Sequence, residues 1–186
     1  MHFNVALHVQ EILLTFMMPY HISRKQFISE GHSAMPSRVN NLGNAFRSCY
    51  RCTGDFADIS HTLSYLQKVM HLTPEGMPGL LTNFGCVLQD RFLHTGDLDD
   101  ISNAISYLQK EVHFTPEGHL DMPCFLSNLA IAFKSRFNST RDLTDISNAI
   151  SYLEKAVHLT PEGHSEMPGL LNYLGIAFKN CFNSTT

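Results

Sequence analysis

The sequence repeats itself at intervals of about 45 residues, and this repetition limits the folds open to the chain. The segment DISNAISYLQKEVHFTPEGH (100–119) returns almost unchanged as DISNAISYLEKAVHLTPEGH (145–164), and a third copy reads HTLSYLQKVMHLTPEG (61–76). A second phrase begins with Met-Pro at positions 35, 77, 122 and 167, at intervals of 42, 45 and 45 residues. Periods of this length are typical of stacked supersecondary units.

The first half of each copy has the apolar spacing of a helix. It begins near Met-Pro, where proline suits an opening helical turn because the N–H that it lacks would have no partner there. In the third copy the apolar face comprises Phe125, Leu126, Leu129, Ala132, Phe133 and Phe137. One helical pair cannot bury its own apolar face, whereas stacked pairs can, which explains why the unit is repeated.

The second half of each copy predicts another helix, with its own start and stop signals. Its start is marked by the natural N-cap residues Asp55, Asp97 and Asp142. It ends at TPEG, because proline cannot continue a helix and glycine can reverse the chain. The last turn carries His71, His113 and His158, where a partial positive charge is favoured. In the last complete copy the apolar side comprises Ile146, Ala149, Ile150, Leu153, Ala156 and Val157.

These intervals resemble those of the tetratricopeptide repeat (TPR). Leu174-Gly175 is followed by Phe178, as in the first-helix signature of that family, and Leu42-Gly43 by Phe46. In the second helix, the small, large, small and proline positions of the family match Ala149, Leu153, Ala156 and Pro161. The copy before it has Glu111 in place of the second small residue. The TPR unit has 34 residues, so the unit here has a longer hairpin and a longer linker.

The resemblance implies an all-α fold, a TPR-like α-solenoid of antiparallel helix pairs over residues 31–186. Its units would lie near 35–76, 77–121 and 122–166, with a partial unit at 167–186 that lacks a second helix. Residues 1–30 would form a divergent segment or a degenerate repeat. The phrases TGDLDDI, AVHLTPEGH and NLGNAF are similar to long TPR-type repeats of mushroom-forming fungi, which often precede a CHAT domain, a caspase-like cysteine peptidase.

Composition narrows the class of partner and the compartment. The formal net charge is −4 and the longest basic cluster is Arg24-Lys25, so we expect no nucleic-acid binding. No run approaches the ~20 apolar residues of a membrane span. The short apolar run at 12–18 follows Glu11 and has no Lys or Arg before it, which argues against a signal peptide. An odd number of cysteines, five, does not suggest a disulfide scaffold. We therefore expect a cytoplasmic protein.

The sequence offers few residues for catalysis or metal binding. Cys49 and Cys52 form a CxxC, but a zinc or redox site would need a second ligand pair or a βαβ context, and neither is present. The histidines recur because the repeat recurs, and stacked units hold equivalent positions ~10 Å apart or more. That is too far for one ion. We predict no enzyme activity, no metal and no cofactor, because motifs of the common catalytic and nucleotide sites are also missing.

The TPR resemblance implies a binding surface instead, a concave groove lined by the first helices. The positions that correspond to groove-facing residues of the family are Asn40, Asn44, Arg47, Thr82, Gln89, Ser127, Lys134, Asn172 and Lys179. Their mixture of amides, hydroxyls and cations would suit a peptide or protein partner. The unfinished C-terminal face could also allow self-association.

Three functional hypotheses remain open. The first is a non-catalytic scaffold or adaptor that binds a protein or peptide. The second is a regulatory or sensor fragment of a larger CHAT-type peptidase protein. The third is a decayed paralogue without a function of its own, for which an exposed C-terminal apolar face would predict aggregation.

Overall fold

The computed structural model describes residues 47, 59–60, 63, 66–67 and 79–185. This part contains five helices and no strand: α5 (Leu80–Thr95), α6 (Leu98–Phe114), α7 (Met122–Thr140), α8 (Leu143–Leu159) and α9 (Met167–Thr185). The predicted all-α class is confirmed for these residues. The predictions for the N-terminal segment, Asn40, Asn44, the CxxC pair and Asp55 lie outside the described residues.

Helices α6 and α8, the second helices of their copies, begin and end at the residues that the sequence predicts. The side chains of Asp97 and Asp142 accept hydrogen bonds from the backbone N–H of Asp99 and of Thr144, respectively. The ends of α6 and α8 precede the two TPEG segments, where Gly118 and Gly163 have φ of 81° and 79°. Such left-handed angles suit glycine, so each TPEG segment can turn the chain toward the next helix.

Helices α5, α7 and α9, the first helices of their copies, do not all begin at the same repeat position. Helices α7 and α9 start at the methionine of Met-Pro, as predicted. Helix α5 starts at Leu80, two residues after Pro78, and its N-cap residue Gly79 has φ 86°. The linker before α5 lacks three residues present in the later linkers. We attribute the later start of α5 to this shorter linker.

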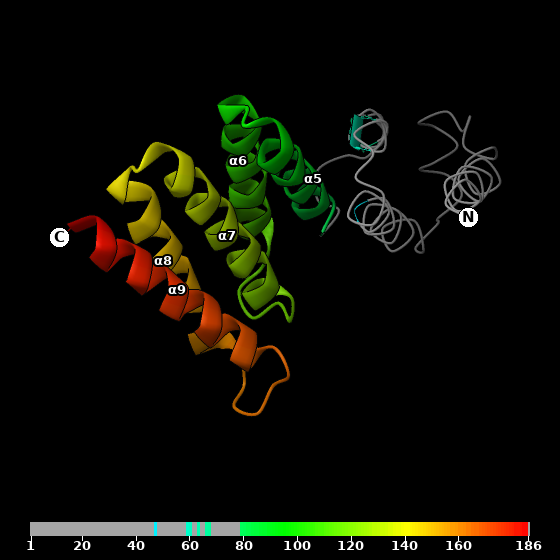
Figure 1. Ribbon diagram of the computed structural model, residues 1–186. Helices are drawn as coiled ribbons and strands as arrows, with labels where there is room; N and C mark the ends of the chain where they lie inside the picture. Colours follow the sequence, from blue (N-terminus) through cyan, green and yellow to red (C-terminus); the bar gives the residue numbers. More distant parts are fainter. Residues whose placement is uncertain (1–46, 48–58, 61–62, 64–65, 68–78, 186) are drawn as a thin grey trace, which may run out of the picture.

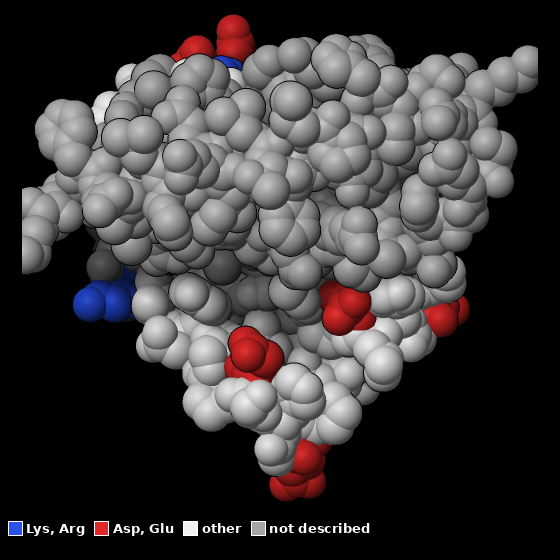
Figure 2. Space-filling view, turned by 90° about the vertical axis from the view of Figure 1, so that its right-hand side faces the viewer, with Lys and Arg blue, Asp and Glu red and all other residues white. Residues whose placement is uncertain are grey.

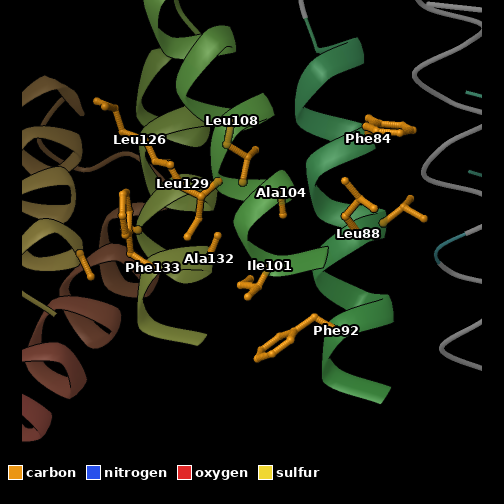
Figure 3. Packing of buried hydrophobic residues seen from close by; sticks show 14 of the residues in the cluster. Phe84, Leu88, Phe92, Ile101, Ala104, Leu108, Leu126, Leu129, Ala132 and Phe133 are labelled. Atoms are coloured by element: carbon orange, nitrogen blue, oxygen red, sulfur yellow. The ribbon is translucent and has the colours of Figure 1, made fainter. Parts of the chain in front are cut away.

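The five helices pack in chain order, and α5, α7 and α9 also make contacts along their own series (Figure 1). Each helix contacts the next, α5 also contacts α7, and α7 also contacts α9. Two residues connect α5 to α6 and α7 to α8, whereas seven connect α6 to α7 and α8 to α9. Figure 3 shows Ile101, Ala104 and Leu108 of α6 between side chains of α5 and α7. Each of these three residues is 0% exposed, so this side of α6 lies in a continuous core.

The predicted apolar faces form this core. All six predicted residues of α7 are buried, and so are Ile146, Ala149, Leu153 and Ala156 of α8. Within the described ranges no helix combines the length and the apolar character needed to cross a membrane. The described surface visible in Figure 2 carries separate acidic side chains and little basic surface.

Candidate functional site

The residues predicted to line a groove do not share one environment. Thr82 and Gln89 are buried, Arg47, Ser127 and Lys134 are half-buried, and Asn172 and Lys179 are exposed. Within the described residues, the buried Thr82 hydroxyl has no hydrogen-bond partner. The exposure of the predicted residues therefore increases along the chain from α5 to α9.

This trend follows the contacts of one repeat position, whose side chain contacts the first helix of the next copy. That position holds Arg47, Gln89, Lys134 and Lys179 in successive copies. The Arg47 Nε donates to Asp90 Oδ2 of α5 at 2.7 Å, and the Gln89 Nε2 donates to Ser135 Oγ of α7 at 3.0 Å. The Lys134 ammonium lies 5.8 Å from the ring centroid of Tyr173 in α9, within cation–π range. Three of the predicted groove residues thus join first helices to each other.

The predicted groove residues that remain exposed lie along one side of α9. Asn172, Ile176 and Lys179 follow each other at helical spacing, so they lie on one side of the helix. All three are exposed, and Ile176 is 37% exposed. We name these three residues the polar stripe. Tyr173, with Lys134 above its ring, lies beside it.

One ion pair with a buried carboxylate joins the two helices of each hairpin, α5 to α6 and α7 to α8. The Arg91 guanidinium donates twice to Asp100, and Arg136 donates twice to Asp145, at 2.8 and 2.6 Å. Both carboxylate side chains are at most 4% exposed. The hydrogen bonds that the guanidinium groups donate to the aspartates raise the pKa of both arginines. Each bidentate pair neutralises a buried carboxylate with a part-buried guanidinium group, which favours one register between the two helices of the hairpin.

The sequence contains a signal for these pairs, since an arginine precedes an aspartate by nine residues in both copies. Cys49 and Cys181 stand at the same repeat position as these arginines, and the spacing alone assigns the arginines no partner. The pairing becomes evident in the structure, because the arginine and the aspartate face each other across the hairpin turn only once both helices are folded.

Glu111, which departs from the TPR pattern, binds backbone N–H groups at the start of α5. Its Oε1 accepts a hydrogen bond from the Gly79 N–H at 2.9 Å and its Oε2 accepts one from the Thr82 N–H at 3.2 Å. The Thr82 N–H lies in the first turn of α5, and the Gly79 N–H belongs to its N-cap residue, which provides no side-chain hydrogen bond. A carboxylate is favoured at a helix N-terminus, so Glu111 of α6 caps α5.

The histidines of the two long linkers also have a local task. The Nδ1 atoms of His119 and His164 accept hydrogen bonds from the backbone N–H of Asp121 and Glu166 at 3.2 and 3.3 Å. They support the same turn before α7 and before α9. In the described part of the chain, no three His, Cys, Asp or Glu side chains are grouped as metal ligands would be.

The buried cysteine of α5 is not a reactive thiol. Cys86 is 2% exposed. Burial raises the pKa of its thiol to about 11, although the positive charge of Arg47 opposes this shift. Because the thiolate is the reactive form, Cys86 acts as a small core residue at neutral pH.

No protein-family model and no curated protein matches this chain.

Proposed function

We propose that this chain is a non-catalytic protein-interaction module, built as a TPR-like solenoid. In this architecture α5 with α6 and α7 with α8 form two antiparallel pairs, and α9 is the first helix of a third unit. The support is the regular contact pattern, in which each first helix contacts the next first helix. The bounds of α6 and α8 are 45 residues apart, and so are those of α7 and α9.

The binding surface that we propose runs from Lys134 over Tyr173 to the polar stripe of α9. The observation that carries the proposal is the open polar stripe itself. On α5 and α7 the equivalent positions are covered or half-covered by the next first helix, whereas on α9 they are exposed. A cation, an amide and an aliphatic side chain at successive turns suit a peptide with a carboxylate beside an apolar side chain.

A binding experiment with a matched control tests this function. The chain would be screened against peptides that combine acidic and apolar residues, and against binders captured from a lysate. We expect a saturable partner whose binding weakens about tenfold or more in Asn172→Ala/Lys179→Ala and at higher salt. The control Glu154→Ala/Lys155→Ala changes two exposed residues of α8 and should leave binding unchanged.

Arg47→Ala is not a suitable probe of this surface. Arg47 is half-buried and bonded to Asp90, so its removal would alter packing between helices as well as any binding. A failure to find any saturable partner, or equal binding by the stripe variant and the control variant, would contradict the proposed function.

A further inference from the structure

The turn between α7 and α8 contains an arginine in a strained backbone conformation. Arg141 is the C-cap residue of α7 and has φ 60° and ψ 20°, in the left-handed region. Among the residues that the structure describes, it is the only one other than glycine with a positive φ. The preceding copy has Gly96 at this position, with φ 76°. Residues with a side chain are disfavoured in this conformation, so stability alone would favour glycine here.

The contacts of Arg141 within the described residues do not explain this strain. Its guanidinium lies 5.7 Å from the ring centroid of Phe137, within cation–π range. Arg136 makes a similar contact with Phe133 at 5.6 Å from inside α7, so such a contact does not require a left-handed backbone. Arg136 also pairs with Asp145, whereas no described carboxylate pairs with Arg141. Strained residues of this kind are often found at binding sites.

Arg141 lies at a hollow between this turn and the last turns of α9. The hollow has a volume of about 580 Å³ and is lined by Arg141, Leu143, Asn180, Asn183 and Ser184. We name it the polar hollow. Figure 1 shows the C-terminal end of α9 near the turn between α7 and α8. No described aspartate or glutamate lines the hollow, so its charge comes from the arginine.

The polar hollow is rich in hydrogen-bond donors. A guanidinium group has five N–H donors and each asparagine amide has two. Among the described residues, the side-chain amides of Asn180 and Asn183 have no hydrogen-bond partner. The Ser184 hydroxyl donates to the Asn180 carbonyl oxygen at 2.9 Å. The acid next to Arg141 in the chain, Asp142, accepts a hydrogen bond from the Thr144 N–H at 2.9 Å as the N-cap of α8.

The preceding copy lacks this combination of side chains. Arg141 corresponds to Gly96, which has no side chain. Asn180 corresponds to Ser135, which is buried and hydrogen-bonded to Gln89. The cation and one of the amides are therefore specific to the turn beside α9 and are not general features of the repeat.

We propose that the polar hollow binds a phosphate monoester group, with the Arg141 guanidinium as its cationic partner and the amides of Asn180 and Asn183 as further donors. A guanidinium group matches a phosphate with two parallel N–H bonds. A phosphate has three terminal oxygens and a carboxylate has two, so a phosphate makes fuller use of a guanidinium beside two amides. The polar stripe contributes none of these residues, so the inference does not depend on the proposed function.

Inorganic phosphate is the first probe. It would be titrated into the full chain at constant ionic strength and about pH 7.5, where phosphate is mostly a dianion. We expect saturable shifts of the NMR signals of the Arg141 Nε–H and of the Asn180 and Asn183 amide groups, with a Kd of roughly 1–10 mM. Acetate should bind about fivefold more weakly or worse, because it offers fewer acceptor oxygens and less charge.

Arg141→Gly separates binding from stability. It restores the glycine of the preceding copy, so the midpoint of thermal unfolding should not fall. Phosphate binding should weaken about tenfold or more, because the cation is lost. A lower midpoint together with unchanged binding would assign Arg141 to its contact with Phe137 alone and would overturn the inference.

The amides have a matched control on α7. Asn180→Ala/Asn183→Ala removes both amides from the hollow and should weaken phosphate binding about threefold or more, with helical circular dichroism retained. Asn138 is exposed and occupies the repeat position of Asn183, but it does not line the hollow. Asn138→Ala should bind phosphate within about twofold of wild type.

A pool of peptides with one fixed phosphoserine distinguishes the two sources of a phosphate monoester. If the pool displaces phosphate about tenfold more tightly than free O-phosphoserine does, the source is a phosphorylated protein. Equal displacement indicates a small phosphate ester, and either result supports the site. The inference is overturned if phosphate causes no saturable shift up to about 50 mM, if Arg141→Gly binds as well as wild type, or if acetate binds as tightly as phosphate.

Discussion

At the scale of the residue, several positions of the repeat carry different side chains in different copies. Glu111 and Ala156 share one position, and the carboxylate of Glu111 serves as the cap that Gly79 lacks. Arg136 and Cys181 share another, and only the arginine can neutralise a buried aspartate. The chemistry of a position therefore follows from which helix lies opposite it.

Glu111→Ala tests the cap directly. Glu111 is 3% exposed, and its removal would leave the backbone N–H groups of Gly79 and Thr82 at the start of α5 without their acceptor. We expect a loss of about 2–4 kcal/mol in the free energy of unfolding, measured by urea denaturation. Glu154→Ala, an exposed change on α8, should cost less than about 0.5 kcal/mol. Equal losses would show that Glu111 is not a cap.

At the scale of the element, the sequence predicts where a helix begins and ends better than it predicts which other helices surround it. The N-cap aspartates, the TPEG stops and the apolar faces of α7 and α8 can all be read locally, since each depends on neighbours within a few turns. The bonds from Gln89 to Ser135 and from Arg136 to Asp145 depend on other helices. Sequence spacing therefore predicted Gln89 on the correct helix but as a groove residue, whereas it lies buried between α5 and α7.

The register of α8 can be tested with two neighbouring substitutions. Ala149 is fully buried, and Ala149→Asp would place a carboxylate between packed helices. We expect a loss of several kcal/mol, roughly 3–5 kcal/mol, or complete unfolding. Ser147 is exposed on the same helix, and Ser147→Asp adds the same charge there. It should be nearly silent in thermal unfolding, so similar losses for both variants would contradict the register.

The cap of α8 predicts a dependence on pH. The hydrogen bond from the Thr144 backbone N–H lowers the pKa of Asp142 below its ordinary value. A lowered pKa in the folded state means that the stabilising contribution is present above the pKa of the unfolded carboxyl, near 4. It is lost as the pH falls through the lower folded value. Thermal unfolding of Asp142→Ala should therefore approach that of wild type as the pH falls below about 4. A difference that stays constant as the pH falls would exclude the linkage.

At the scale of the whole molecule, repetition determines both what is buried and what is open. The interval of 45 residues predicted stacked helical units, and it allows each position of α9 to be compared with the equivalent position of α7. The polar stripe of α9 is exposed, whereas the equivalent positions are half-buried on α7 and buried on α5. A single sequence shows the repeat but not which sides remain open, because that depends on the packing between units.

The most direct test of this account compares one repeat position in two copies by the free energy of unfolding. In Gly85→Ala the added Cβ would meet Leu108 and the Ala104 carbonyl oxygen, and a backbone atom cannot easily move away. We predict a loss of roughly 1–3 kcal/mol. In Gly175→Ala the methyl group enters open space, and alanine favours the helix, so we predict a gain of about 0.5–1 kcal/mol. A loss in both variants, or a gain in both, would contradict the claim that α9 presents openly the side that α5 and α7 bury.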